Sequence, residues 1–141
     1  LQPGVGVAQV LVAIALGLVV PGLVHGFIGD GARPRKPLLV LRFVAIVIWD
    51  IIVSNVTVAR IVLSPTARPN PAWVPVPLDT RHPTAVTLLA TVITTTPGTL
   101  SCVVDDEKWV IHVHALDCDD PAAMAAQIKQ RYERALMEIF E

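Results

Sequence analysis

Asp50 is the residue of this chain best placed for ion or proton chemistry. It lies in the apolar run LLVLRFVAIVIWDIIVSNVTVARIVL, residues 38–63, and is the only charged residue between Arg42 and Arg60. A carboxylate inside such a run normally faces protein or water, because burial in lipid is costly. If the run is a helix, its polar side chains fall on or beside one stripe. The stripe contains Arg42, Asp50, Ser54 and Thr57, and Asn55 flanks it.

This polar stripe has two interpretations. In the first, Asp50, Ser54, Asn55 and Thr57 contribute to an ion path. In the second, which we favour because one carboxylate does not define a transport route, Asp50 is a structural group. Arg42 lies two helical turns away, about 12 Å by helix rise, which is too far for direct pairing. We therefore expect Ser54, water or groups from neighbouring subunits to stabilise the carboxylate.

Histidine and cysteine residues in the C-terminal half raise the question of a metal or catalytic site. His112 and His114 share one face of a predicted strand, and Cys102, Asp117 and Cys118 are near in sequence. The chain has no CxxC or HExxH spacing, GxSxG elbow, P-loop or GxGxxG motif. A zinc enzyme is therefore a weak hypothesis. We predict a protein that is not an enzyme, with no catalytic residue, metal or cofactor.

Two long apolar segments form the N-terminal part of the chain. Residues 5–29 contain no Asp, Glu, Lys or Arg, and about 20 apolar residues suffice to span a bilayer core. Residues 38–63 form the second segment. We predict a membrane region over residues 1–63. The first segment has two pairs of small residues four apart, a spacing that allows close helix packing in lipid or is incidental; the pairs are Ala13 with Gly17 and Gly22 with Gly26.

The charge pattern does not settle whether residues 38–63 cross the bilayer or lie in its interface. Both flanks of the segment are basic, with Arg33, Arg35 and Lys36 before it and Arg60 and Arg68 at and after its end. Basic flanks favour the cytoplasm, and both can lie there only if the helix is interfacial. Interfacial helices have low overall hydrophobicity, whereas this segment is strongly apolar. We therefore favour a crossing helix.

The remaining chain predicts a small α+β domain of order β-α-β-β-α with its helices on one face of a sheet. A linker with six prolines, residues 64–83, leads into this domain, residues 84–141, and supplies its first strand. Pro97-Gly98 fits a type II turn with a positive φ at Gly98. In the last helix we expect solvated charges, including Glu133. The predicted strands are 73–78, 100–104 and 109–116, a helix precedes the turn, and another begins near Pro121.

Charge and cysteine content limit the location and the partners. Residues 1–81 carry seven basic and three acidic side chains, and residues 105–141 carry four basic and nine acidic ones. An acidic soluble half does not suggest nucleic acid as a partner. The chain has only two cysteines, which favours a reducing, cytoplasmic setting for this half. The predicted fold class is therefore membrane α-helices followed by a small α+β cytoplasmic domain.

Four stretches of the chain resemble the E subunit of the multisubunit Na⁺/H⁺ antiporters of the Mrp, Mnh or Pha type. They are WDIIVSNVTVARIVLSP at 49–65, LATVITTTPGTLS at 89–101, VHALDCDDP at 113–121 and IKQRYERALMEIFE at 128–141. Within them, the most specific elements are a TPGT turn and a VHALD segment, which we take as a signature of the fold: Thr96, Pro97, Gly98, Thr99, His114 and Asp117.

The resemblance implies an accessory subunit of a bacterial cell-membrane complex that exchanges cytoplasmic Na⁺ for external H⁺. Its partners would be the other subunits, the lipid bilayer and the transported Na⁺ and H⁺. It also implies a multi-pass protein with a cytoplasmic C-terminal domain, and a further membrane helix upstream of Leu1. The alternative is a membrane-tethered adaptor that recruits a cytoplasmic partner. A tether would need neither a polar stripe nor a packing face of small residues.

Overall fold

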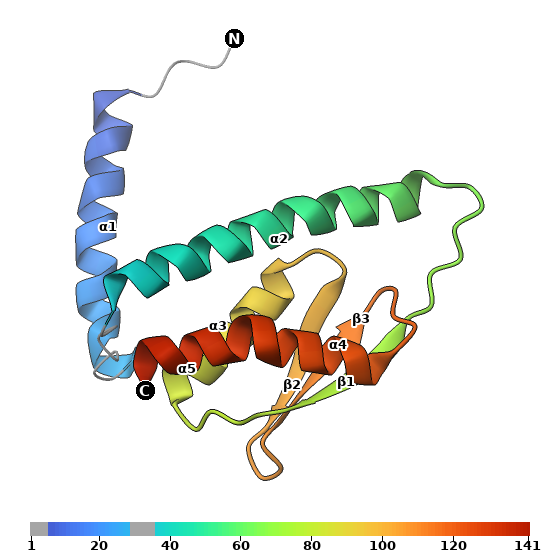
Figure 1. Ribbon diagram of the computed structural model, residues 1–141. Helices are drawn as coiled ribbons and strands as arrows, with labels where there is room; N and C mark the ends of the chain where they lie inside the picture. Colours follow the sequence, from blue (N-terminus) through green and yellow to red (C-terminus); the bar gives the residue numbers. More distant parts are fainter. Residues whose placement is uncertain (1–5, 29–35) are drawn as a thin grey trace. The chain divides into compact units, whose positions relative to one another are not determined.

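The computed structural model describes residues 6–28 and 36–141 (Figure 1). Contacts within the chain divide it into two units, Leu1–Ala32 and Arg33–Glu141. The first unit contains the helix α1 (Val7–Ile28), whose described side chains, up to residue 20, are exposed. This helix matches the predicted apolar segment at 5–29 as far as that segment is described.

The second unit contains all other elements, in the order predicted for the soluble domain but preceded by a long helix. That helix is α2 (Pro37–Leu63). Among the described residues it is the one helix long and apolar enough to cross a membrane. The elements that follow are β1 (Ala72–Pro77), α3 (Pro83–Thr95), β2 (Thr99–Asp105), β3 (Val110–Ala115), α4 (Pro121–Ile128), the π-helical turn η1 (Lys129–Glu133) and α5 (Arg134–Phe140).

The three strands form an antiparallel sheet of order β1-β3-β2, covered on one face by helices. Alternation in β1 and β3 turns one set of side chains inward, and Val74, Val76, Ile111 and Val113 are fully buried. These side chains meet residues of α3 and α5 in one core, to which Leu89, Ile93, Leu136 and Ile139 contribute. The prediction of helices with a small sheet is confirmed, and the elements after α2 follow one another as β1, α3, β2, β3 and α4.

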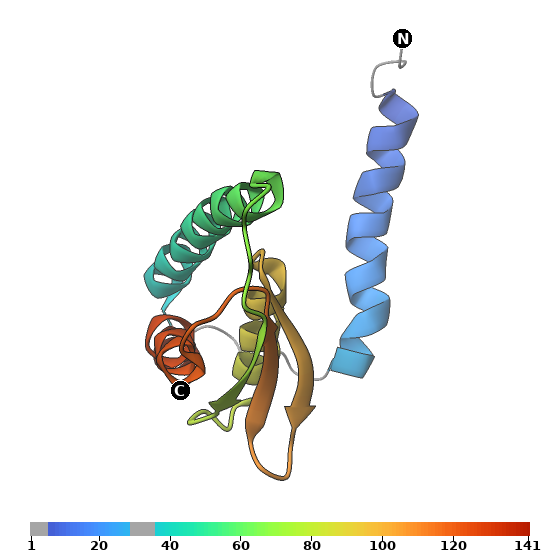
Figure 2. The ribbon, with the colours of Figure 1, turned by 90° about the vertical axis from the view of Figure 1, so that its right-hand side faces the viewer.

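Helix α2 lies beside the C-terminal helix and contacts α5 (Figure 2). Every third or fourth side chain is buried or half-buried, which is the spacing of one helical face. We call this set the inner face: Leu39, Phe43, Val47, Asp50, Ser54, Val58 and Ile61. Phe43 is 8% exposed, and its ring packs edge-on against Tyr132 at 6.5 Å between centroids. The membrane region predicted over residues 1–63 stays a prediction, but its second helix packs with the sheet domain.

The chain between α2 and β1 is anchored to the domain at Asn70. Its backbone N–H donates to the Asp117 carboxylate at 2.9 Å, and its side-chain amide donates to the Cys118 carbonyl at 3.2 Å. The Cys118 N–H donates in return to the Asn70 carbonyl at 2.9 Å. Asn70, within the proline-rich segment 64–83, is therefore held by the fold.

The turn between α3 and β2 brings the domain close to α2. Gly98 has φ +91°, and the Thr99 N–H donates to the Thr96 carbonyl, as in the predicted type II turn. A Cβ on Gly98 would stand 3.2 Å from Cγ2 of Val58 on the inner face of α2. Glycine therefore serves two purposes here, since it adopts the positive φ and leaves room for α2.

We predict that Gly98→Ala lowers the free energy of unfolding of the detergent-solubilised chain by about 1–3 kcal/mol, because a non-glycine residue is strained at this φ. Thermal or denaturant unfolding followed by circular dichroism measures the change. The double variant Gly98→Ala/Val58→Ala separates the two causes, because it removes the contact with α2 and leaves the strain. A Gly98→Ala protein as stable as the parent would show that neither the backbone strain nor the contact with α2 destabilises the variant.

Candidate functional site

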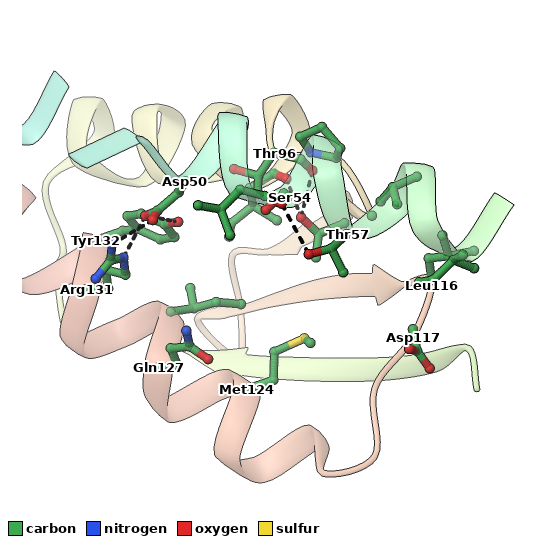
Figure 3. A pocket seen from close by; sticks show the side chains of 18 residues that line it. Asp50, Ser54, Thr57, Thr96, Leu116, Asp117, Met124, Gln127, Arg131 and Tyr132 are labelled. Carbon is green, nitrogen blue, oxygen red and sulfur yellow. Dashed lines mark hydrogen bonds and ion pairs between the residues drawn. The ribbon is translucent and has the colours of Figure 1, made fainter. Parts of the chain in front are cut away.

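Asp50 meets two side chains of the C-terminal helix. The Arg131 guanidinium donates from Nε to Oδ2 and from Nη2 to Oδ1, both at 2.6 Å. The Tyr132 hydroxyl donates to Oδ2 at 2.8 Å. We call Asp50, Arg131 and Tyr132 the Asp50 cluster (Figure 3). A bidentate guanidinium–carboxylate pair is among the strongest polar contacts in proteins. Here the Tyr132 hydroxyl is a third donor to the same carboxylate.

The partners of Asp50 correct the expectation drawn from the sequence. Ser54, water and other subunits were the expected stabilisers, whereas the structure places Arg131 and Tyr132 of the same chain there. Both lie more than 80 positions further along the chain, and the sequence alone does not bring them to α2. The sequence did contain one general indication of these partners. A carboxylate in an apolar helix requires a cation, and the last helix contains arginines.

The π-helical turn η1 supplies both partners at once. The Arg134 N–H donates to the Lys129 carbonyl, the five-residue spacing that marks a π-helix and that often occurs at functional sites. Within this turn, Arg131 and Tyr132 reach α2, whereas Lys129 and Glu133 reach the loop after β1. The widened turn thus joins the C-terminal helix to two separate segments.

Electrostatics keep the donors of the Asp50 cluster protonated. Burial, followed by the hydrogen bond to Asp50, raises the pKa of Tyr132 to about 12. The hydrogen bond to Asp50 is the main cause that raises the pKa of Arg131. The Asp50 side chain is 14% exposed, and both of its oxygens have partners. Its charge is therefore matched within the chain.

Glu133 forms a second polar centre on the opposite side of η1. Its side chain is 1% exposed, and Oε1 accepts from the N–H groups of Asp79 at 2.6 Å and Thr80 at 3.0 Å. Lys129 lies 3.1 Å from Oε2 and 2.8 Å from Asp79. Burial opposes the charge of Lys129, but its hydrogen bonds to Asp79 and Glu133 raise its pKa. The prediction that Glu133 is a solvated charge is therefore wrong, because it binds the β1–α3 loop.

A cavity of about 460 Å³ lies between the inner face of α2 and the sheet domain, next to the Asp50 cluster. Figure 3 shows its lining. Two sets of residues predicted from the sequence line this cavity. The first set consists of the ion-path candidates Asp50, Ser54 and Thr57. The second set consists of the fold-signature residues Thr96, Pro97, Gly98, Thr99 and Asp117. Its remaining lining is largely apolar, with Val58, Ile61, Leu116 and Met124 among its residues.

The polar side chains around this cavity have local partners. Thr57 donates to the Val53 carbonyl at 3.1 Å. In the signature turn, Thr96 donates to the Val92 carbonyl at 2.8 Å and Thr99 to the Ile93 carbonyl at 2.7 Å, which completes the end of α3. The TPGT segment therefore ends a helix and places α2.

Two of the singled-out residues do not line the cavity. Asn55 is exposed and donates to the Ile51 carbonyl of its own helix at 2.7 Å. His114 lies on the uncovered face of the sheet, where its ring meets Trp73 at 5.1 Å between centroids. The signature residue His114 and the ion-path candidate Asn55 thus stand apart from the Asp50 cluster.

The small residues of α1 are described in part. Ala13 and Gly17 are exposed, and within the described residues a Cβ added to Gly17 would meet no atom within 4 Å. Gly22 and Gly26 belong to the same helix, but the structure does not describe their surroundings.

Histidine, cysteine and carboxylate side chains are dispersed. Among residues 6–28 and 36–141, no group of three or more His, Cys, Asp or Glu residues could hold a metal ion. Cys102 is exposed and Cys118 is buried. His112 and His114 share the uncovered sheet face, and their half-buried side chains alternate with buried core residues.

Comparison with known proteins gives one consistent family. Residues 1–139 match the family model described as "Na+/H+ ion antiporter subunit" (MNHE). The E subunit of the Na⁺/H⁺ antiporter of Alkalihalophilus pseudofirmus is 29% identical over 92% of this chain and 82% of its own length. The E subunit of a probable K⁺/H⁺ antiporter of Rhizobium meliloti is 34% identical over 92% of this chain and 83% of its own length.

Two solved structures share the fold. One chain of the Mrp complex from Dietzia sp. DQ12-45-1b matches 75% of this chain and all of its own, with a TM-score of 0.56 and 28% identity. One chain of an archaeal respiratory membrane complex, the membrane-bound sulfane sulfur reductase, matches 99% of this chain and 89% of its own, with a TM-score of 0.69 and 25% identity.

We predict that the Asp50–Arg131 pair stabilises the docking of α2 on the domain. Asp50→Asn should lower the free energy of unfolding by about 1–3 kcal/mol, since it weakens hydrogen bonds to a charged group. A double-mutant cycle with Arg131→Gln, measured by chemical unfolding, should give a coupling above about 1 kcal/mol.

A pair on the same helix provides the matched control. Arg134 and Glu138 lie 3.7 Å apart with side chains 75% and 54% exposed, and such pairs contribute about 0.3–0.5 kcal/mol. A coupling for Asp50–Arg131 no larger than that of Arg134–Glu138 would show that the Asp50 cluster does not stabilise the docked helix.

Proposed function

Because the chain belongs to the Na⁺/H⁺ ion antiporter subunit family (MNHE), we propose that it is the E subunit of a multisubunit antiporter that exchanges a monovalent cation for H⁺. The observation that carries this proposal is the family match, which spans residues 1–139. Relatives named for Na⁺/H⁺ and for K⁺/H⁺ antiport are both similar over most of the chain. The proposed substrate is accordingly a monovalent cation, Na⁺ or K⁺.

The proposed partners are the other subunits of the complex and the lipid bilayer. The likeness to a chain of the Mrp complex supports this, because that chain was solved within its assembly. Helix α1 would anchor the protein, and the small residues Ala13, Gly17, Gly22 and Gly26 would pack against other membrane helices. The rival hypothesis, an adaptor tethered by a generic anchor, is not favoured, because the family match includes the apolar N-terminal part.

We propose a structural role for Asp50 within this complex. Both carboxylate oxygens are engaged by Arg131 and Tyr132, which leaves the group poorly suited to bind a passing cation. Its ion-path companions Ser54 and Thr57 face the same intramolecular cavity. The polar stripe therefore places α2 on the domain, and transport belongs to other parts of the complex.

The C-terminal domain of this membrane protein is proposed to lie in the cytoplasm of a bacterial cell. Its nine acidic and four basic side chains over residues 105–141 avoid the charge that binds anionic lipid, and both cysteines are free. Free cysteines are typical of a reducing compartment.

We predict that antiport per assembled complex is unchanged by Asp50→Asn. The measurement is cation-induced proton exchange in everted membrane vesicles, across pH, normalised to the complex recovered by gentle purification. The amide keeps the shape of the carboxylate and removes its charge. A lowered rate or a shifted pH profile in an assembled Asp50→Asn complex would restore the ion path.

A variant of α1 gives the contrasting result in the same assay. A Cβ added to Gly17 meets no described atom within 4 Å, so Gly17→Leu tests the proposed packing of α1 against other membrane helices. It should reduce the amount of complex and leave the activity per complex unchanged, whereas Gly17→Ala should assemble normally. Loss of antiport in Gly17→Leu without loss of complex would contradict the assembly role.

The cytoplasmic location predicts the labelling of a cysteine at Lys108, in the β2–β3 turn, where the side chain is 76% exposed. In a Cys102→Ser background, needed because Cys102 is exposed, Lys108→Cys should react with a membrane-impermeant thiol reagent in everted vesicles and not in intact cells. Efficient labelling of intact cells would place the domain on the external side.

A further inference from the structure

We infer that α2 does not cross the bilayer but lies flat in its cytoplasmic interface, with one face in the lipid and the opposite face on the sheet domain. The inference rests on the proposed membrane location of the protein and adds how this helix meets the lipid. It is drawn from the two faces of α2 and from what covers each.

The face of α2 turned away from the domain is apolar along its whole length. We call it the outer face, and it consists of Leu38, Leu41, Ala45, Ile48, Ile52, Val56, Ala59 and Leu63. Leu41, Ile52 and Leu63 are 66%, 53% and 81% exposed. They are eleven residues apart, which is close to three helical turns, so they lie on one line. No charged or polar residue interrupts this line.

Basic side chains mark one margin of the outer face. Arg42 and Arg60 are eighteen residues apart, which is five full turns, so both project from the same side of the helix. Trp49 lies between them on this side and is 62% exposed. Lys36 precedes the helix. Cations at the margin of an apolar face, with an exposed tryptophan beside them, match a helix at the level of anionic phosphates.

The sheet domain covers the opposite face. Phe43 packs on Tyr132, Asp50 binds Arg131, and Val58 stands against Gly98. These contacts cover about four turns of the helix. A crossing α2 would therefore carry the domain's charged surface into the hydrocarbon, or would separate from it and leave Asp50 unpaired there. Each buried charge costs several kcal/mol, and an interfacial position avoids both.

The strong hydrophobicity of α2 favoured a crossing helix in the sequence, but the structure accounts for it differently. Interfacial helices have low overall hydrophobicity when one face meets water. Here the inner face meets a protein core, so apolar residues such as Phe43 and Val47 occur on that side as well. A helix between lipid and a domain is apolar on two sides without spanning the membrane. The basic residues before and after α2 can then both lie in the cytoplasm.

Spin labels along the outer face test this position. Single cysteines replace Leu41, Ile52 and Leu63 in turn, in a Cys102→Ser/Cys118→Ala background, and the labelled complex is reconstituted into liposomes that contain anionic phospholipid. Accessibility to oxygen and to a water-soluble nickel complex gives the depth of each label. Lys108→Cys is the aqueous control, and complex yield and antiport are recorded for every variant.

The three labels should show equal oxygen access and one shallow depth, about 5–10 Å below the head groups. A crossing helix would place Ile52 deeper than Leu41 and Leu63 by about 15 Å, since eleven residues rise about that far; this result overturns the inference. Low access to both reagents at all three sites would show that another protein covers the outer face, which also overturns it. A wild-type chain recovered without other subunits, or an assembled wild-type complex without antiport, would instead count against the proposed function.

Discussion

The structure depends on a single requirement, that the carboxylate of Asp50 must be neutralised in an otherwise apolar helix. An isolated charge among Ile, Val and Trp side chains would be prohibitively costly in lipid and costly in a protein core. Arg131 and Tyr132 meet this need with three short hydrogen bonds. The same bonds position α2 on the C-terminal helix, and thereby determine which face of α2 is left for other partners.

The π-helical turn η1 supplies both side chains that neutralise Asp50. Neighbouring side chains of a helix lie about 100° apart, so residues close together in the sequence can face two different surfaces. In η1, Arg131 and Tyr132 bind α2, while Lys129 and Glu133 bind the loop that follows β1. Because both polar centres are built on one turn, the positions of α2 and of the loop are coupled through it.

Helix α2 of this antiporter subunit packs on the sheet domain with one face and is apolar on the opposite face. Its inner face contacts the signature turn at Gly98 and borders the cavity beside Asp50. A protein with this construction can link its sheet domain to a membrane assembly through α2. Five of the six fold-signature residues accordingly border the cavity between α2 and the domain, and His114 is the exception.

The sequence by itself determined the local elements and the family. Alternation predicted one strand face for Trp109, Ile111, Val113 and Ala115, and the last three are buried in β3, whereas Trp109 precedes this strand with a positive φ. Pro97-Gly98 specified a turn with a positive φ at Gly98. Strand alternation and glycine conformation are properties of a few neighbouring residues. Only the tertiary structure decided the partners of Asp50, the burial of Glu133 and the place of α2. Those depend on pairings across more than 50 residues, and neither hydrophobicity nor periodicity carries information about which distant cation meets a given carboxylate.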